Sequence, residues 1–469
     1  MADNAHGAER LFGTDGIRGT PGVYPLTDGM IFKIGCSISK VIQYKQQKKE
    51  NLRVIIGKDT RLSGGRIESL LCDAVVGYGI DVVLVGIMTT PGLSFLVRDL
   101  DADMGIMISA SHNKASDNGI KFFNAKGHKL LQQEERWIEK IIFEELIHTN
   151  GVTNGFKLDQ KGRVSTLEDA SSRYISFLTN VVQGLDLKGM RIAIDCAWGA
   201  TSLFARELFE KLGARVFSIH DLPQGENINQ GGTMDPCILR EVVLQDSANI
   251  GIAFDGDGDR GIVIDEKGNI LDGDYILAII ARYLLEQNKL AHNSIVATVM
   301  SNYGLKVSIE EKGGKIITTK VGDKHVLEAL INNDLTIGGE QSGHIVFLDY
   351  LPTPDGMLTA LMMLKVVREK QVPLSELASC MQKFPQTLIN VKVREKKPFE
   401  EIPSVKERLK KFESQLKDDI RILLRYSGTE PLARIMVEGK DKKVIEDIAR
   451  SIADRVREEI GIAEEEAHA

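Results

Sequence analysis

Three aspartates separated by single glycines are the strongest chemical signal in this sequence of 469 residues. They form the run Asp255-Gly-Asp-Gly-Asp-Arg260, which lies between two apolar segments, 250–254 and 261–264. Because glycine permits a tight backbone curve, the three carboxylates can converge on one hard divalent cation. Mg²⁺ is the metal we expect, since it binds carboxylate and phosphate oxygens and keeps some of its water.

Two alternatives remain open for this acidic run. An EF-hand calcium loop starting at Asp255 would have Glu266 at its last ligand position, as observed, but it requires a glycine where Arg260 stands and helices at both flanks. The other alternative is an exposed acidic turn. Few such turns place three carboxylates beside an arginine between two buried strands.

A hydroxyl stands beside cationic groups in the loop Ser109-Ala-Ser-His-Asn-Lys-Ala-Ser-Asp-Asn-Gly-Ile-Lys121. The loop follows the apolar segment 104–108, and ligands of open α/β sheets bind beyond the carboxyl ends of the strands. Ser111, with His112 next to it and Lys121 further on, could carry or accept a phosphoryl group. The alternative is a solvated turn, because Ser, Asn, Asp and Gly are common turn residues.

Three further segments give weaker signals. In Gly338-Gly-Glu-Gln-Ser-Gly-His344, Glu340 and Ser342 could bind neighbouring sugar hydroxyls, and Gln341 offers both a donor and an acceptor. In Leu11-Phe-Gly-Thr-Asp-Gly-Ile-Arg-Gly19, Arg18 could reach a transferring phosphoryl group. A plain turn and a structural arginine are the respective alternatives.

The third of these segments is Arg425-Tyr-Ser-Gly-Thr-Glu-Pro-Leu-Ala-Arg434. Ser427, Gly428 and Thr429 could form a concave nest of backbone N–H groups and hydroxyls for an anion. Arg425 and Arg434 could add bidentate contacts to a phosphate. A polar hairpin turn is the alternative.

The elements that must position these loops repeat along the chain. Three segments read strand, helix, strand: 53–57, 66–78 and 81–85; 190–194, 202–212 and 215–219; 294–298, 303–312 and 315–319. In each, glycine (Gly79, Gly213, Gly313 with Gly314) separates the helix from the second strand. Such units form right-handed βαβ crossovers, so we predict three related α/β domains. Unrelated units in one large sheet are the alternative.

The C-terminal part has a different order of elements. Strands are predicted at 388–393, 420–425 and 433–438, and helices at 402–416 and 441–460, which indicates an α+β domain with an antiparallel sheet. Residues 368–373 are the expected hinge, and 464–469 an expected frayed end. The predicted domains are 1–154, 155–258, 259–372 and 373–469.

Composition limits the function classes. With 43% hydrophobic and 27% charged residues, the chain is typical of globular proteins, which excludes general disorder, collagen and a membrane bundle. Its net charge of −7 disfavours nonspecific nucleic-acid binding. No apolar run approaches the ~18 residues of a membrane span, and the start has no signal-peptide core. Five scattered cysteines without C-x-x-C spacing indicate a reducing, cytoplasmic location.

Taken together, five motifs in this order resemble the α-D-phosphohexomutase superfamily from Phe12 to about Gly461. The motifs are F-G-T-D-G-I-R-G, S-A-S-H-N, D-G-D-G-D-R, G-E-Q-S-G-H and R-Y-S-G-T-E-P. Each alone is weak to moderate, whereas the ordered set is specific. The resemblance implies four domains around a central cleft, and a homodimer is usual in the superfamily.

The resemblance also implies a role for each loop. Ser111 would be the phosphoserine of the resting enzyme, and one of its oxygens would join the metal ligands Asp255, Asp257 and Asp259. The sugar hydroxyls would be bound by Glu340 and Ser342. The basic lining of the reaction centre would be Arg18, His112, Lys121, Arg260 and His344. The phosphate that does not react would be held by Arg425, Ser427, Gly428, Thr429 and Arg434.

Three segments look like the glucosamine branch of the superfamily: Gln341, Met300-Ser-Asn302, and Lys320-Val-Gly-Asp323 near the substrate, with Lys320, Gly322 and Asp323 as contacts. This branch interconverts glucosamine 6-phosphate and glucosamine 1-phosphate through a bisphosphorylated sugar, glucosamine 1,6-bisphosphate, and so feeds UDP-N-acetylglucosamine and cell-wall synthesis. The alternatives are the same chemistry on glucose or mannose phosphates, a metal-dependent phosphatase, and a non-catalytic sugar-phosphate sensor. Either Lys121 or His344 could be the general base.

Two positions depart from the superfamily pattern. Lys114 replaces the proline that usually follows S-H-N, and proline would stiffen the loop by fixing φ. The rigidity of the Ser111 loop is therefore an open question. Tyr426 replaces the usual alanine or proline, but the anion-binding residues around it are retained.

Overall fold

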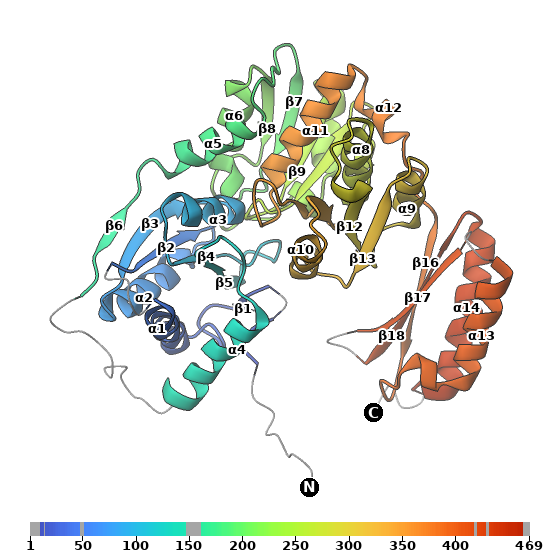
Figure 1. Cartoon of the computed structure of the whole chain (residues 1–469), viewed down its shortest axis with the longest axis horizontal. Helices are drawn as coiled ribbons and strands as arrows, with labels where there is room; N and C mark the ends of the chain where they lie inside the picture. Colours follow the sequence, from blue (N-terminus) through green and yellow to red (C-terminus); the bar gives the residue numbers. More distant parts are fainter. Residues whose placement is uncertain are drawn as a thin grey trace, which may run out of the picture. The chain divides into compact units, whose positions relative to one another are not determined.

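A computed structural model of the chain describes residues 10–13, 15–46, 51–146, 161–416, 420–427 and 431–462. Its contacts divide the chain into two compact units (Figure 1). The first comprises residues 1–300 and 312–380, and the second comprises 301–311 and 381–469. The segment 368–373, expected to be a hinge, therefore lies inside the first unit. The four predicted domain boundaries remain predictions.

The first sheet of the first unit carries the Ser111 loop. Its six strands have the order β1-β5-β4-β2-β3-β6, and they span Ile17–Gly19 (β1), Arg53–Lys58 (β2), Asp81–Ile87 (β3), Met104–Ile108 (β4), Asn118–Asn124 (β5) and Val164–Thr166 (β6). β2 is parallel to β3 and β4, whereas β5 is antiparallel to β4. The helices around it are Asp28–Lys45 (α1), Gly64–Gly77 (α2), Thr90–Asp99 (α3) and Gln132–Lys140 (α4), which continues as a π-helix over Ile141–Leu146.

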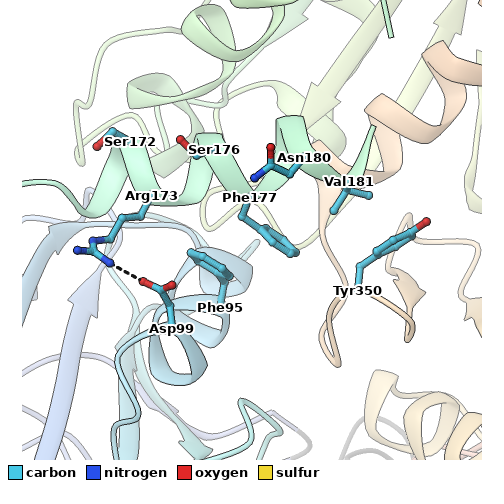
Figure 2. A pocket seen from close by; sticks show the side chains of 9 residues that line it. All are labelled: Phe95, Asp99, Ser172, Arg173, Ser176, Phe177, Asn180, Val181 and Tyr350. Carbon is cyan, nitrogen blue, oxygen red and sulfur yellow. Dashed lines mark hydrogen bonds and ion pairs between the residues drawn. The ribbon is translucent and has the colours of Figure 1, made fainter. Parts of the chain in front are cut away.

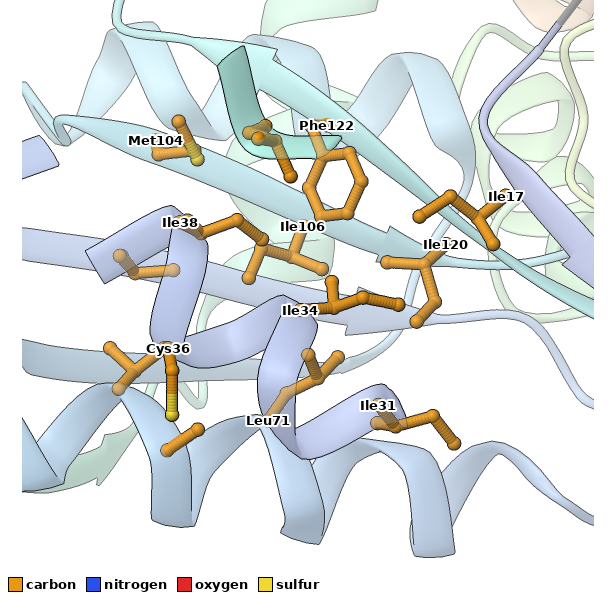
Figure 3. Packing of buried hydrophobic residues seen from close by; sticks show 14 of the residues in the cluster. Ile17, Ile31, Ile34, Cys36, Ile38, Leu71, Met104, Ile106, Ile120 and Phe122 are labelled. Carbon is orange, nitrogen blue, oxygen red and sulfur yellow. The ribbon is translucent and has the colours of Figure 1, made fainter. Parts of the chain in front are cut away.

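Buried aliphatic side chains hold α1 and α2 on this sheet. Ile34 and Ile38 of α1 lie near Ile106 of β4, and Leu71 of α2 belongs to the same core (Figure 3). The helices approach closely at Gly35, where an added Cβ would lie 2.6 Å from the Cβ of Ala74. The whole length of β4 is buried, as its unbroken apolar run predicts.

The second sheet carries the acidic run, in the hairpin between β9 and β10. Its order is β11-β10-β9-β7-β8, with strands Arg191–Asp195 (β7), Arg215–Ile219 (β8), Ile250–Phe254 (β9), Gly261–Asp265 (β10) and Ile270–Leu271 (β11). The α-helices are Ala170–Val181 (α5), Ala205–Lys211 (α6) and Cys237–Gln245 (α7), and the 3₁₀ turns are Ala200–Leu203 and Gly232–Met234. The helix predicted over 202–212 is therefore split into a 3₁₀ turn and α6.

The third sheet has the order β13-β12-β14-β15. Its strands are Ser294–Thr298 (β12), Lys315–Thr319 (β13), Ile337–Gly339 (β14) and Ile345–Phe347 (β15). The helices of this part of the first unit are Gly273–Glu286 (α8), Asp323–Asn332 (α10), Gly356–Lys370 (α11) and Leu374–Ala378 (α12), with a 3₁₀ turn over Ala291–Asn293. The Gly338–His344 loop joins two antiparallel strands, β14 and β15.

The predicted βαβ units are confirmed. The strand pairs β2–β3, β7–β8 and β12–β13 are each parallel. The glycines before the second strands have positive φ angles, 75° at Gly79, 97° at Gly213 and 76° at Gly313. Glycine adopts such angles without steric cost, so it ends each helix and turns the chain back toward the sheet.

The second unit is an α+β structure, as predicted. Its antiparallel sheet has the order β16-β18-β17, with strands Gln386–Lys392 (β16), Ile420–Tyr426 (β17) and Leu432–Gly439 (β18). The helices are Tyr303–Glu310 (α9), Pro403–Leu416 (α13) and Lys442–Ile460 (α14), with a 3₁₀ turn over Phe399–Glu401.

A buried carboxylate explains why the segment 301–311 belongs to the second unit. Glu438 of β18 is fully buried, and its Oε1 accepts hydrogen bonds from Asn302 Nδ2 at 2.9 Å and from the backbone N–H of Tyr303 at 3.3 Å. Gln386 and Arg421 donate to the same carboxylate. Since an unsatisfied buried carboxylate is costly, these bonds fix the start of α9 to the sheet. Asn302 therefore has a structural function here.

Among the helices that the structure describes, none combines the length and apolar character needed to cross a bilayer.

A hydrogen bond in the second sheet predicts a pH-dependent stability. His220 Nδ1 lies 3.0 Å from Oδ1 of the buried Asp195, and this bond raises the pKa of His220 above 6.5. Its contribution is complete below 6.5 and is lost as the pH rises through the raised pKa. We expect His220→Asn to lower the free energy of unfolding by about 1.5–3 kcal/mol at pH 6, and by less at pH 9. Urea denaturation at both pH values measures this difference.

The matched control is His325→Asn, because His325 is exposed on α10 and lies 3.5 Å from Glu328. It should change the unfolding midpoint little at either pH. An equal loss of stability in His220→Asn at pH 6 and pH 9 would contradict the assignment.

Candidate active site

The three aspartates between β9 and β10 converge. Asp255, Asp257 and Asp259 are buried, and one carboxylate oxygen from each lies within 4.8 Å of the other two. Gly258 makes the tight curve with a φ of 70°, and an added Cβ there would lie 2.9 Å from Thr89. This geometry could hold a metal ion.

A buried lysine partly balances these carboxylates. Lys121 Nζ lies 2.8 Å from Asp257 Oδ2, 3.3 Å from Asp259 Oδ2 and 3.0 Å from Asp15 Oδ2. Burial lowers the pKa of Lys121, but the three carboxylates outweigh it and raise the pKa well above 10.5. Lys121 therefore carries its positive charge at the centre of the site.

Two features of the acidic cluster fit a divalent cation. Asp257 Oδ1 is buried and has no hydrogen-bond partner in the part of the chain that the structure describes. Burial, and then the charges of Asp259 and Asp257, raise the pKa of Asp255 to about 8. Ionising all three carboxylates is therefore unfavourable when only the cationic side chains of the protein lie beside them. Carboxylate oxygens are the ligands that Mg²⁺ prefers.

Ser111 lies at this cluster, although it is distant in sequence. It follows the carboxyl end of β4 with a φ of 51°, and its side chain is buried. Its Oγ donates a hydrogen bond to Asp255 Oδ2 at 2.9 Å and lies 3.5 Å from His112 Nδ1. The structure therefore brings the seryl oxygen and the acidic run together at one point.

Arg260 connects two histidines beside Ser111. Its Nη2 lies 2.8 Å from His112 Nδ1 and its Nε lies 3.2 Å from His344 Nε2. Burial, followed by the charges of Arg260 and Arg18, lowers the pKa of His112 to about 4. Burial also opposes the charge on His344, but Asp259, 2.9 Å away, outweighs it and raises that pKa to about 9. At neutral pH His112 is therefore neutral and His344 is protonated.

The structure places Arg18 beside the Ser111 loop. Its Nη2 pairs with Asp15 Oδ2 at 2.5 Å, and its Nη1 donates to Asn113 Oδ1 at 3.2 Å. Asp15 also binds Lys121 and Lys129, so the N-terminal motif joins the same charge network.

The Gly338–His344 loop, which we expect to bind the sugar, contacts the segment just before α10. Glu340 Oε1 accepts the backbone N–H of Gly322 at 2.8 Å, and its Oε2 lies 3.2 Å from His344 Nδ1. Ser342 Oγ lies 3.4 Å from the same nitrogen. Asp323 accepts from Lys129 at 2.6 Å, whereas Lys320 is exposed.

The Gln341 side chain of the same loop contacts helix α8 rather than the Gly322 segment. Its Nε2 donates to Asp272 Oδ2 at 3.2 Å, at the start of α8. The backbone of Gln341 accepts the N–H of Gly273 at 3.0 Å. In this arrangement the carboxamide nitrogen anchors the loop to α8.

The predicted phosphate loop lies in the second unit, between β17 and β18. Arg425 and Arg434 face each other across the two strands. Burial, and then the charge of Arg434, lowers the pKa of Arg425. Arg434 Nη2 donates to Ser427 Oγ at 3.4 Å. Gly428 and Thr429 lie outside the described residues.

Several polar residues of these sites were not predicted from the sequence. The set consists of Asp15, Arg61, Thr90, Lys129, Asn229 and Lys396. Asp15 lies in the same motif as Arg18, which was a usable signal. Thr90 donates its backbone N–H to Asp257 O at 2.9 Å, and Lys396 donates to Ser427 O at 2.6 Å. Apart from Asp15, they stand singly in the chain, so no spacing marks them.

A cavity of about 660 Å³ lies elsewhere in the first unit, between α3, α5 and Tyr350 (Figure 2). Phe95 and Phe177 stack in its wall with their ring centres 4.5 Å apart, and Arg173 pairs with Asp99 at 2.9 Å. No residue of the predicted site lines this cavity.

Comparison with known proteins identifies the family. Four profiles of phosphoglucomutase/phosphomannomutase match in order: α/β/α domain I at residues 9–147, domain II at 172–268, domain III at 272–384 and the C-terminal domain at 388–455. Phosphoglucosamine mutase of Syntrophotalea carbinolica is 44% identical over 98% of this chain and 99% of its own length. That of Geobacter metallireducens is 45% identical, over 97% and 99%. The chain belongs to the phosphoglucosamine mutases.

Membership of the phosphohexomutase superfamily, predicted from the five motifs, is thereby confirmed. A crystal structure of a phosphoglucomutase/phosphomannomutase family protein from Burkholderia thailandensis superimposes with a TM-score of 0.78 at 22% identity, covering 96% of this chain and 99% of that one. At this identity the likeness supports the fold alone. The phosphohexomutase family depends on metal, and the acidic trio is where this chain could bind it.

The charge balance around Lys121 generates a prediction. Lys121→Met leaves the buried Asp257 and Asp259, and the partly buried Asp15, without their shared cation, so we expect a loss of about 3–5 kcal/mol in stability without metal. A divalent cation supplies positive charge at the same place, so Mg²⁺ should restore part of the loss. Thermal unfolding in EDTA and in Mg²⁺ measures both effects.

Lys126→Met is the matched control, because Lys126 is an exposed lysine just beyond the same strand. It should unfold like the wild type in both buffers. If Lys121→Met unfolded at the wild-type temperature in EDTA, the proposed balance of charges would be refuted.

Proposed function

We propose that this chain interconverts glucosamine 6-phosphate and glucosamine 1-phosphate through phosphorylated Ser111. The observation that carries the proposal is the 2.9 Å contact between Ser111 Oγ and Asp255, in a chain 44% identical to a phosphoglucosamine mutase along 98% of its length. The phosphoryl group of phosphorylated Ser111 passes to the free hydroxyl of the bound sugar, the bond to Ser111 Oγ breaks, and the proton of the sugar hydroxyl ends on the serine. The products are glucosamine 1,6-bisphosphate and free Ser111. Return of the other phosphate to Ser111 completes the exchange.

Mg²⁺ is the metal we propose, held by Asp255, Asp257, Asp259 and an oxygen of phosphorylated Ser111. When bound, it neutralises negative charge on the reacting phosphoryl group. Phosphoryl transfer depends on in-line positioning and charge stabilisation more than on covalent help. The neighbouring cations Arg18, Lys121 and Arg260 add to that stabilisation.

The remaining residues bind and orient the sugar phosphate. Glu340 and Ser342 take the sugar hydroxyls, with Lys320, Gly322 and Asp323 beside them. The phosphate that does not react is bound by Arg425, Ser427, Gly428, Thr429 and Arg434. Because either end of the sugar must fit there in turn, arginines and backbone N–H groups suit this task better than a pocket shaped for one end. His112 and His344 line the reaction centre. Lys121 or His344 would act as the base after losing its proton, and Mg²⁺ bound to the carboxylates beside both groups would favour that loss by lowering their pKa.

The wider setting of this activity is also part of the proposal. The product feeds UDP-N-acetylglucosamine and cell-wall synthesis in the cytoplasm, and the enzyme works as a homodimer. Glucosamine 1,6-bisphosphate is both the intermediate and an activator.

The decisive experiment follows phosphate and sugar together. With glucosamine 6-phosphate and Mg²⁺, we expect glucosamine 1-phosphate to form, and mass spectrometry to find a phosphate on Ser111. Ser111→Ala should lower kcat by several orders of magnitude, because the group that is transferred is no longer attached. Ser116→Ala, an exposed serine of the same loop, is the control and should keep wild-type activity.

Other outcomes would overturn the proposal. Full activity in Ser111→Ala refutes the phosphoserine. Steady release of inorganic phosphate without isomerisation indicates a phosphatase, and a clear preference for mannose 1-phosphate or glucose 1-phosphate indicates another branch of the superfamily. Absence of turnover on all three sugars, with phosphate binding retained, indicates a sensor.

A further inference from the structure

One buried guanidinium group, that of Arg61, donates hydrogen bonds to the main chain of the loop that carries Ser111. Arg61 follows β2, and its side chain is fully buried against Asp59, whose Oδ2 lies 3.0 Å from Arg61 Nε. Its Nη2 donates to the carbonyl oxygens of Ser111 at 2.9 Å and Asn113 at 2.8 Å. Its Nη1 donates to the carbonyl oxygens at positions 114 and 117. Arg61 thus fixes the main chain on both sides of the serine.

Asn229 binds two of the same carbonyl oxygens from another part of the chain. It lies on the loop after β8, and its Nδ2 donates to Ser111 O and Asn113 O, both at 2.8 Å. Its Oδ1 accepts the backbone N–H of Gly256, also at 2.8 Å. A single carboxamide therefore links the main chain of the Ser111 loop to the main chain of the acidic run.

The backbone around Asn229 is built to present this side chain. Asn229 has a φ of 66°, a left-handed conformation that asparagine tolerates better than most residues. Its N–H donates to Ala197 O at 2.9 Å, and Asp195 fixes the same loop through the N–H of Gly232 at 2.9 Å. At Gly256 an added Cβ would lie 3.0 Å from Asn229 Nδ2, so the two loops touch closely.

These contacts answer the question raised by Lys114. The family's usual proline would stiffen the Ser111 loop from within by fixing φ. Here Arg61 and Asn229 stiffen the loop from outside, through carbonyl oxygens that any residue supplies. The identity of residue 114 can therefore vary without loosening the serine.

We propose that Asn229 is a positioning residue that keeps Ser111 Oγ in register with the Asp255–Asp259 carboxylates by tying their two loops together. Among the hydrogen bonds of the described residues, the Asn229 side chain makes none to Ser111 Oγ or to a carboxylate, so it acts through the main chain. The proposal rests on the proposed function for its activity readout, but its structural readout does not. Small displacements at a phosphoryl-transfer centre lower the rate strongly, because the reaction requires in-line geometry.

Asn229→Gly tests the proposal, since glycine keeps the positive φ and removes only the carboxamide. We expect kcat to fall about tenfold to a hundredfold while KM for the sugar phosphate stays within about twofold. The Mg²⁺ concentration for half-maximal activity should rise. Backbone hydrogen exchange of residues 111–118 should accelerate in the purified protein without substrate.

Asn229→Asp tests the bonds to the Ser111 loop separately from the bond to Gly256. Its carboxylate can still accept from Gly256, but it places negative oxygens against two carbonyl oxygens, so it should lower kcat at least as far as Asn229→Gly. The control is Asn227→Ala, because the Asn227 side chain on the same loop contacts only Gln224 among the hydrogen bonds of described residues. It should match the wild type in kcat and in exchange.

Two results would overturn the assignment. One is wild-type kcat, Mg²⁺ dependence and exchange in Asn229→Gly. The other is a loss of activity that follows the unfolded fraction and occurs equally in Asn227→Ala, which indicates a general loss of stability. If the wild type turned over no sugar phosphate while exchange at 111–118 still depended on Asn229, the proposed function would fail and the link between the loops would stand.

Discussion

Like charges held close together inside the protein are the constraint on which the rest of the site depends. Asp15, Asp257 and Asp259 all lie within 3.3 Å of Lys121 Nζ, and Lys121, Asp257 and Asp259 are buried while Asp15 is partly exposed. A buried carboxylate is tolerated only when a cation or several donors face it. Lys121 on β5 meets that requirement as the cation, and Thr90 on α3 meets it as a donor, since its Oγ1 donates to Asp257 Oδ2. The first two sheets of the first unit are therefore joined by charge as well as by packing.

Much of this arrangement could be predicted from local sequence. The βαβ units follow from apolar runs and glycine breaks, because strand, helix and turn are each decided by a few neighbouring residues. The loops that bear Ser111 and the three aspartates could be located because each follows an apolar run with a stretch of polar residues and glycine. Strand ends then place such loops at one edge of a sheet.

The rest could not be predicted, for physical reasons that particular residues illustrate. Arg61 and Asn229 bind carbonyl oxygens, which every residue has, so nothing in the sequence of the Ser111 loop indicates its partners. Asn302 belongs to a segment that resembles the glucosamine branch, but the sequence does not reveal its hydrogen bond to Glu438, which makes it part of the second unit. Gln341 likewise had a predicted chemical role, and only the three-dimensional contact with Asp272 reveals what its amide nitrogen binds. These contacts join residues that are far apart in the chain, and no local sequence pattern predicts that they lie close together in space.

In the second unit the like charges that lie close together are positive instead of negative. Arg425 and Arg434 are directly opposite each other on antiparallel strands, a pairing of like charges that is unfavourable by itself. Burial, and then the charge of Arg434, lowers the pKa of Arg425. A phosphate placed between the two guanidinium groups would turn the repulsion into attraction, just as a divalent cation would among the three aspartates. In both loops the fold keeps like charges near one another, and a ligand of the opposite charge would balance them.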